Sequence, residues 1–302
     1  MNWLKNLNNK WTRPEELTLD LPIELPDPFS SAKTIDEVHE YFAGYIMSTD
    51  PYLQQEGSLP GRCFVCNMDV LFEVDRPKDG GEVNWRETLK CPHCHLINRW
   101  RGCLHLFEAI CKPTRLDRIY ITEALTPVNE HLSGVYTNLT SSEFMPQAQA
   151  GEMVKVHSRT VRNEDVTNLT FDTGSFDSIL SFDVLEHVPN YQRALEEFYR
   201  VLDFGGHLII TAPFSFQKAT QVRATVDEEG EVTHLVEPCY HGDPLSDEGV
   251  LAYYDFGMEL LDQLNDVGFK ESYLACYTSN DWGYPSGNVA FIARKPSTLR
   301  TK

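Results

Sequence analysis

The sequence lacks the long apolar runs that membrane-spanning helices need, since no stretch approaches about 18 consecutive apolar residues. Basic residues are also scarce: 26 Lys and Arg stand against 45 Asp and Glu, for a net charge of −19. A surface of this sign is a poor partner for nucleic acids and for anionic membranes, so neither is expected to bind. Residues 1–11 contain no apolar stretch of about seven residues, so we expect no secretory signal there and predict a cytoplasmic protein.

Eight cysteines are present, and four of them form two Cys-x-x-Cys pairs: Cys63, Cys66, Cys91 and Cys94. Each pair can hold a metal ion from a tight turn, and two pairs complete a tetrahedral site of four thiolates. The 24 residues between the pairs suit a small β-hairpin. We therefore predict a zinc ribbon with these four ligands, and a structural zinc ion, because four thiolates leave no open coordination position. His93 and His95 are alternative ligands, and two redox-active pairs are the rival interpretation.

The stretch Phe176–Phe214 predicts a strand, a helix and a second strand. An apolar run that ends at Phe182 indicates a buried parallel strand. Asn190 marks the start of a helix, and Gly205 and Gly206 are expected to end it. A crossover of this kind is right-handed and gathers its loops at the carboxyl edge of the sheet, where ligands of open α/β sheets bind.

The same stretch reads FDSILSFDVLEHVPN and then RVLDFGGHLIITAPF. It resembles the fourth-strand and fifth-strand motifs of class I S-adenosylmethionine-dependent methyltransferases, in the LEHV subgroup (methyltransferase type 11-like). The resemblance covers about residues 114–296 and implies an α/β fold, with a Rossmann-like seven-stranded sheet and helices on both faces, preceded by the small zinc-ribbon module. Methyltransferases with such a ribbon often carry arginines soon after the last cysteine pair, a feature that Arg99 and Arg101 match.

Three domains are expected from this layout. Residues 1–55 form an arm and a helix, 56–112 the ribbon with a linking helix, and 113–302 the methyltransferase domain. Thr34 and Glu37 predict a capping box at the start of the first helix. That helix covers the active site, packs on the body or forms a homodimer contact.

The first motif departs from the superfamily pattern, because a glycine-free segment, Thr122–Pro127, stands where a glycine-rich turn is usual. It resembles the ITE-x-x-TP motif of a ribbon-bearing branch. The resemblance implies that S-adenosylmethionine contacts Thr122, Glu123, Ala124, Thr126, Glu143, Asp165, Val166, Phe182 and Asp183. Glu143 is expected to accept hydrogen bonds from the ribose hydroxyls, with a solvated loop residue as the alternative. Asp165, or less favourably Glu164, is expected at the adenine amino group.

Residues 215–256 are expected to form an insert that acts as a substrate lid, with a hairpin around Gly230. Its candidate catalytic residues are His241, which an imidazole's titration near neutral pH suits to general-base work, and His234. A structural turn role for His241 stays open, and His187 of the LEHV motif is expected mainly to pack. Candidate substrate contacts are Arg223, Tyr240 and Tyr254.

These features together predict a methyltransferase that acts on a small-molecule or glycan-precursor acceptor, at oxygen. Two alternatives remain. One is a catalytically silent binding module, because the first motif lacks glycine. The other is a protein or RNA methyltransferase that uses the ribbon for recognition, against which the acidic composition weighs.

Overall fold

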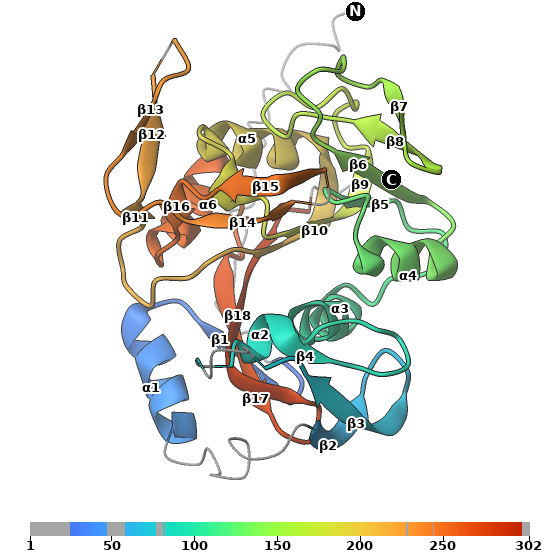
Figure 1. Ribbon diagram of the computed structural model, residues 1–302, viewed down its shortest axis with the longest axis vertical. Helices are drawn as coiled ribbons and strands as arrows, with labels where there is room; N and C mark the ends of the chain where they lie inside the picture. Colours follow the sequence, from blue (N-terminus) through green and yellow to red (C-terminus); the bar gives the residue numbers. More distant parts are fainter. Residues whose placement is uncertain are drawn as a thin grey trace, which may run out of the picture.

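The computed structural model describes residues 25–46, 58–76, 81, 83–227, 229–243 and 245–297. They form an α/β fold on a mixed sheet of nine strands in the order β1-β17-β18-β10-β9-β5-β6-β8-β7 (Figure 1). The strands are β1 (Phe29–Ala32), β5 (Ile119–Ile121), β6 (Leu139–Glu143), β7 (Met153–Val156), β8 (Arg159–Asn163), β9 (Phe176–Phe182), β10 (Leu202–Thr211), β17 (Tyr273–Ser279) and β18 (Tyr284–Arg294).

The expected count of seven strands is wrong, and the two edge strands account for the difference. At one edge, β1 from the amino-terminal arm pairs antiparallel with β17 in the register Phe29↔Tyr277 to Ala32↔Leu274. At the other edge, β7 pairs antiparallel with β8. Between them, β8, β6, β5, β9 and β10 run parallel to their neighbours, so their carboxyl ends meet at one edge of the sheet.

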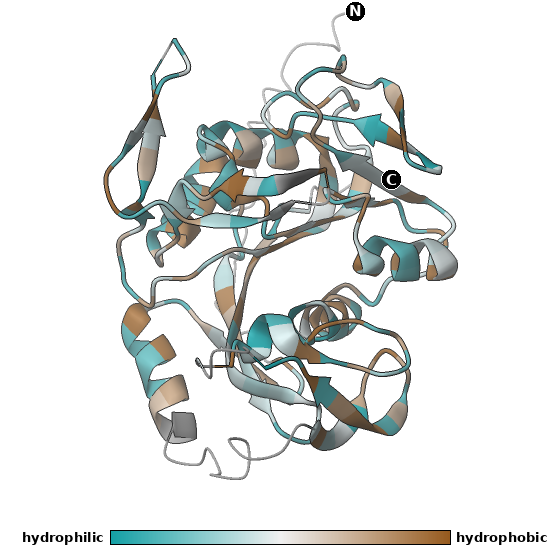
Figure 2. Cartoon of the chain, in the orientation of Figure 1, coloured by the Kyte–Doolittle hydropathy of each residue, from teal (hydrophilic) through white to brown (hydrophobic). Residues whose placement is uncertain are grey.

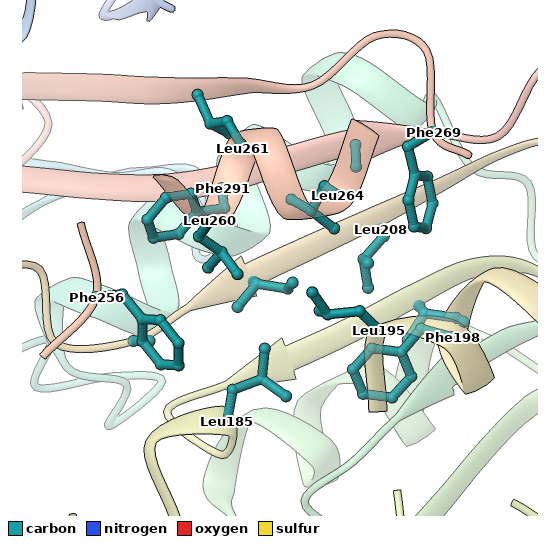
Figure 3. Packing of buried hydrophobic residues seen from close by; sticks show 14 of the residues in the cluster. Leu185, Leu195, Phe198, Leu208, Phe256, Leu260, Leu261, Leu264, Phe269 and Phe291 are labelled. Atoms are coloured by element: carbon teal, nitrogen blue, oxygen red, sulfur yellow. The ribbon is translucent and has the colours of Figure 1, made fainter. Parts of the chain in front are cut away.

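Helices cover both faces of the sheet, as expected. Their bounds are α1 (Ile35–Ile46), α2 (Trp85–Thr88), α3 (Asn98–Cys111), α4 (Pro127–Val135), the 3-10 turn η2 (Leu185–His187), α5 (Tyr191–Val201) and α6 (Glu259–Val267). Alternate strand residues point to opposite faces, and here Ile179 packs with α5 and α6 while its neighbour Leu180 packs with α3 and α4. Figure 3 shows the first of these two cores, in which Leu195, Phe198 and Leu260 close over the sheet.

The predicted strand–helix–strand crossover is confirmed as β9, α5 and β10, with one correction. Asn190 caps α5 by accepting a hydrogen bond from the backbone N–H of Arg193. The glycines do not end the helix, because α5 stops at Val201 and β10 begins at the next residue. Gly205 and Gly206 instead lie where the register of β10 against β9 shifts. A Cβ on Gly206 would come within 2.8 Å of the Asp177 carbonyl oxygen, so this irregular stretch of the strand needs glycine.

The capping box before α1 is also confirmed. The backbone N–H of Thr34 donates to Glu37 Oε2 at 3.1 Å, and the N–H of Glu37 donates to Thr34 Oγ1 at 3.3 Å. The reciprocal bonds satisfy amides that the first turn leaves without helical partners.

The cysteine-bearing segment has three strands rather than a hairpin of two. They are β2 (Ser58–Cys63), β3 (Met68–Val74) and β4 (Leu89–Lys90). Arg101 of α3 joins this small sheet to the main body. Its buried guanidinium lies 4.0 Å from the ring centre of Phe72 and donates to the carbonyls of Trp282 and Gly283 in the β17–β18 turn. The match of Arg101 to the family feature therefore falls on a residue with a structural role.

The insert contains three two-stranded antiparallel sheets. Their strands are β11 (Gln221–Val222), β12 (Ala224–Val226), β13 (Val232–His234), β14 (Tyr240–Asp243), β15 (Ser246–Leu251) and β16 (Tyr254–Asp255). The β12–β13 hairpin, predicted from the sequence, extends away from the body with mixed hydropathy (Figures 1 and 2). The β14–β15 hairpin instead contacts the η2 turn after β9, where His187 Nδ1 lies 2.9 Å from the Leu251 carbonyl oxygen. Within the described part of the chain, no helix is long and apolar enough to cross a membrane.

Candidate functional site

A cavity of about 1630 Å³ opens at the carboxyl edge of the parallel strands. Three parts of the chain form its walls: the strand ends, the helices α2 and α3 beside the cysteine segment, and the β14–β15 hairpin of the insert. Typical ligand pockets measure roughly 300–1,000 Å³. The cavity is therefore large enough for two small ligands lying side by side.

Four acidic residues stand in a row along this edge. Asp183 follows β9, Glu123 follows β5, Glu143 ends β6 and Asp165 follows β8, and all four line the cavity. Because β9, β5, β6 and β8 are successive neighbours in the sheet, the carboxylates succeed one another across the cavity floor. Phe182 and Val166 line the same wall.

The glycine-free turn after β5 leaves this cavity open. No residue of the segment 122–127 has a positive φ, so the backbone needs no glycine here. Thr126 caps α4 with its side chain, and Asn129 Nδ2 donates to the Ala124 carbonyl at 2.8 Å. Leu125 lines the cavity together with Thr126, whereas Ala124 is buried behind the wall.

Glu123 is held in an unusual state for a carboxyl group. Its side chain is buried, and burial raises its pKa to about 8. Thr122 Oγ1 donates to Glu123 Oε2 at 2.8 Å, and among the described residues Oε1 has no hydrogen-bond partner. At neutral pH Glu123 is therefore mainly protonated and offers one polar atom without a partner beside the cavity.

Asp183 lies within a cluster of charges that the cysteine segment supplies. Arg86 of α2 donates from Nη1 and Nη2 to the two oxygens of Asp183 at 2.7 and 2.5 Å, and Arg99 Nε of α3 lies 3.2 Å from Oδ2. Glu87 contacts both arginines. Burial alone would raise the pKa of Asp183, but Arg99 and Arg86 hold it well below its usual range. Asp183 also has a φ of 57°, a left-handed conformation that aspartate tolerates better than most residues.

At the other end of the row, the two acidic neighbours after β8 differ in role. Glu164 is fully engaged in structure, since it accepts from Arg162 Nε at 2.6 Å and from the Thr170 N–H at 2.9 Å. Asp165 uses only Oδ1, which accepts the backbone N–H and hydroxyl of Thr167. Oδ2 has no partner in the described part of the chain, so Asp165 is the better candidate for a ligand contact.

Two histidines and a buried glutamate stand on the insert side of the cavity. His187 and His241 line it with their ring centres 4.9 Å apart, and Glu186 lies behind them with no exposed surface. Glu186 Oε1 is 3.4 Å from His241 Nδ1 and 3.7 Å from His187 Nε2. The neighbouring Glu186 raises the pKa of His241. Of the two predicted catalytic histidines, the structure thus brings His241 to the cavity.

The remaining insert residues lie elsewhere. His234 is exposed on β13, and Tyr240 is exposed on β14, outside the cavity wall. Arg223 forms an ion pair with Asp255 at 2.6 Å at the base of the insert. Tyr254 donates its hydroxyl to the Pro189 carbonyl. Arg223 and Tyr254 therefore hold the insert in place, and none of these four is among the residues that line the cavity.

The four predicted metal ligands form a compact group. Their sulfur atoms lie within 4.8 Å of one another, and all four cysteines are free of disulfides. Each pair is closed by a turn in which the residue after the second cysteine has a positive φ, Asn67 in one and His95 in the other. His93 and His95 are exposed and are not part of the group.

Residues 122–210 match the family model described as a methyltransferase domain, a segment that contains all four acidic residues of the row. The matched segment spans 89 of the 302 residues. No curated protein matches the sequence.

Solved structures similar to this chain come from several organisms. One is an S-adenosylmethionine-dependent methyltransferase from Mesorhizobium loti (16% identity, 67% of this chain and 100% of that chain covered, TM-score 0.41). Another is a Burkholderia thailandensis 1,6-didemethyltoxoflavin-N1-methyltransferase with bound S-adenosylhomocysteine (16% identity, 66% and 78% covered, TM-score 0.41). A third, from Methanosarcina mazei, is described as a SAM-dependent methyltransferase (17% identity, 62% and 95% covered, TM-score 0.38).

Several residues around this cavity were not identified from the sequence. Arg86 and Glu87 lie in the spacer between the cysteine pairs, where no local pattern marks them as site residues. Glu186 belongs to the LEHV motif, yet only the fold shows that the insert returns His241 to its side. The sequence feature that could have marked them as site residues is the closely spaced ionisable residues in WRET (85–88) and LEH (185–187).

Proposed function

We propose that this protein is an S-adenosylmethionine-dependent methyltransferase whose cofactor lies across the ends of β9, β5, β6 and β8. The observation that carries the proposal is the row of four acidic side chains on neighbouring strands, which opens into one cavity. The methyltransferase-domain match over the same residues supports it.

The residues of the row fit the parts of this cofactor. Glu143 accepts hydrogen bonds from the ribose hydroxyls, and Asp165 accepts one from the adenine amino group while Val166 packs on the ring. At the opposite end, Asp183 and Glu123 face the ammonium of the amino-acid part, and the Arg86 guanidinium faces its carboxylate. The unpaired Oε1 of Glu123 supports this assignment, because a buried oxygen without a partner is costly unless a ligand satisfies it. The other cofactor residues of the proposal are Thr122, Thr126 and Phe182, which line the cavity, and Ala124, which is buried behind the residues that line it.

The cofactor, when bound, supplies a methyl group that its sulfonium has already activated. The protein's contribution is therefore to hold the acceptor in line with that group and to exclude water. We assign the acceptor to the space between the row and the β14–β15 hairpin. His241, with Glu186 behind it, is the group placed to serve a hydroxyl there, because a positioned proton acceptor contributes roughly a hundredfold or more. A small-molecule or glycan-precursor hydroxyl is the acceptor that we favour.

The four-cysteine group fits a structural zinc ion. At a Zn–S bond length of about 2.3 Å, neighbouring sulfurs of a regular tetrahedron are about 3.8 Å apart. The Cys63–Cys94 and Cys66–Cys91 sulfur separations are both 3.8 Å. The ion would fix the ribbon, and through it α2 and α3, against the cavity. The proposal includes a cytoplasmic location, which the free thiols fit. It also includes the domain division 1–55, 56–112 and 113–302, with a lid at 215–256.

Of the alternatives, a methyltransferase for RNA or protein that reads its target with the ribbon is the less favoured. The ribbon side of the molecule contributes Arg86 and Arg99 to the cavity, which gives it a role without a macromolecular target. A net charge of −19 also disfavours RNA. A silent binding module has the same cofactor site and differs only in turnover.

Isothermal titration with S-adenosylhomocysteine tests the proposal. We expect one binding site per chain, weakened at least tenfold by Glu143→Gln. Glu196→Gln on the exposed face of α5 is the matched control and leaves the affinity unchanged. Absence of binding to the wild-type protein would refute the proposal. Transfer of a labelled methyl group to hydroxylated metabolites, rather than to RNA or protein, would separate the enzyme from its two alternatives.

A further inference from the structure

Glu186 is a buried carboxyl group without a settled partner. Its side chain has no exposed surface, and neither carboxylate oxygen has a hydrogen-bond partner among the described residues. Within the described part of the chain, Asp183 adds a further negative charge to its surroundings, and His241 and His187 oppose that charge. A carboxylate in this position is unfavourable unless a cation neutralises it.

The two imidazoles beside Glu186 present nitrogen atoms to it. His187 Nδ1 lies 2.9 Å from the Leu251 carbonyl oxygen, which can only accept a hydrogen bond. Nδ1 of His187 therefore carries a proton, and in the neutral ring Nε2 presents a lone pair toward Glu186 at 3.7 Å. A backbone carbonyl that fixes the tautomer in this way is the usual second partner of a metal-binding histidine.

We propose that Glu186, His187 and His241 bind a divalent cation at the insert side of the cavity. Their three ligand atoms all lie within 4.8 Å of one another. With metal–ligand distances of about 2.1 Å, two ligands stand roughly 3.0–4.2 Å apart, a range that includes the observed 3.4 and 3.7 Å. Two imidazoles and one carboxylate suit manganese, iron, cobalt or zinc, and leave coordination positions open.

The neighbouring carboxylate of Asp183 is not a further ligand of the proposed cation. Both oxygens of Asp183 are engaged by Arg86, so Asp183 remains with the row of strand-end carboxylates. The open positions of the cation face the cavity that His187 and His241 line. A hydroxyl bound there has a lowered pKa. Binding of the cation is independent of the methyltransferase proposal. The role of the cation in lowering the pKa of an acceptor hydroxyl rests on that proposal.

Manganese is the probe that tests this site, because Mn²⁺ prefers oxygen and imidazole ligands over the thiolates of the cysteine group. Electron paramagnetic resonance of protein loaded with one zinc ion per chain, which the four thiolates take first, measures how much added Mn²⁺ disappears from the free signal. We expect one bound Mn²⁺ per chain, with the affinity reduced at least tenfold in Glu186→Gln and in His241→Asn. His157→Asn is the matched control, since His157 lines the opposite part of the cavity and its φ of 51° suits asparagine.

Thermal unfolding and S-adenosylhomocysteine binding are measured on the same samples. Retention of both in His241→Asn shows that a loss of Mn²⁺ comes from the site and not from misfolding. The inference is overturned if the wild-type protein binds no Mn²⁺ at millimolar concentration, or if the bound Mn²⁺ persists in both variants. Normal S-adenosylhomocysteine binding with no Mn²⁺ uptake would reject the cation site alone and leave the proposed function standing.

Discussion

Arg86 offers the sharpest test of how the cofactor is held, because its guanidinium is the cation that the ribbon side brings to Asp183. We consider the substitution Arg86→Gln, which removes the charge and keeps a polar side chain of moderate length. In the wild-type protein the side chain of Arg86 is 27% exposed and that of Arg99 only 10%, so Arg86 is the more accessible of the two to a ligand's carboxylate.

The expected loss can be estimated from the contacts. A hydrogen bond to a charged group contributes about 1.5–3 kcal/mol. Arg86 is already bonded to Asp183, so an incoming carboxylate shares the guanidinium and the lower end applies. About 1.4 kcal/mol corresponds to a tenfold change in affinity. We therefore expect Arg86→Gln to weaken S-adenosylhomocysteine binding about tenfold.

The assay compares two ligands that differ in the relevant group. 5′-Methylthioadenosine keeps the nucleoside and the sulfur but lacks the amino-acid carbons, so its affinity should be the same for the wild-type protein and for Arg86→Gln. Arg193→Gln, an exposed arginine of α5 that pairs with Glu196, is the control for the loss of a positive charge. Calorimetry of both ligands against all three proteins gives the answer.

The reasoning fails if Arg86→Gln weakens both ligands equally, since the substitution would then act through the shape of the cavity. It fails also if neither ligand is affected. Absence of binding by either ligand to the wild-type protein would instead reject the cofactor proposal itself.

Three further predictions concern the pH dependence, the metal group and the core. The folded-state pKa of Glu123, about 8, lies above the unfolded value of about 4.5, so its stabilising effect is complete below pH 4.5 and is lost as the pH rises through 8. The free energy of unfolding, measured with denaturant, should fall by about 1.4 kcal/mol per pH unit in that window, and Glu123→Gln should flatten the profile. Cys91→Ser should abolish bound zinc, measured by mass spectrometry, and weaken S-adenosylhomocysteine binding through misplacement of α2, whereas Cys239→Ser, outside the cysteine group, should change neither. Phe198→Ala should cost about 3–5 kcal/mol in free energy of unfolding because Phe198 is fully buried, and an equal effect of Phe204→Ala, at a residue 56% exposed, would contradict this account of the core.

The parts of the fold that depend on neighbouring residues were predictable from the sequence. The β9–α5–β10 crossover and the capping box of α1 follow from local patterns of apolar, capping and turn residues, and both are present. The two glycines at 205 and 206 show the limit of such patterns, because a glycine pair is compatible with a helix end and with an irregular strand. Only the packing of β10 against β9 decides between them.

The parts that depend on distant residues were not predictable. The pairing of β1 with β17 joins segments about 245 residues apart, and no pattern in Phe29–Ala32 specifies that partner. The contact of Arg86 with Asp183 spans 97 residues, and that of His241 with Glu186 is equally non-local. Long-range pairs of this kind are set by how whole elements pack. The strand-end carboxylates and Arg99 could therefore be named from the sequence, whereas the contact of Arg86 with Asp183 could not.

The pairing of β1 along β17 has a consequence for shortened forms of the protein. A fragment that begins at residue 113 would retain every strand from β5 to β18 but would leave the backbone of Tyr273–Ser279 unpaired along one side. Bare strand edges are templates for intermolecular association. Such a fragment would also expose the β17–β18 turn, whose carbonyl groups accept hydrogen bonds from Arg101 in the full chain. We therefore expect this fragment to self-associate on expression. In the full chain, the amino-terminal third protects the edge of the sheet against aggregation.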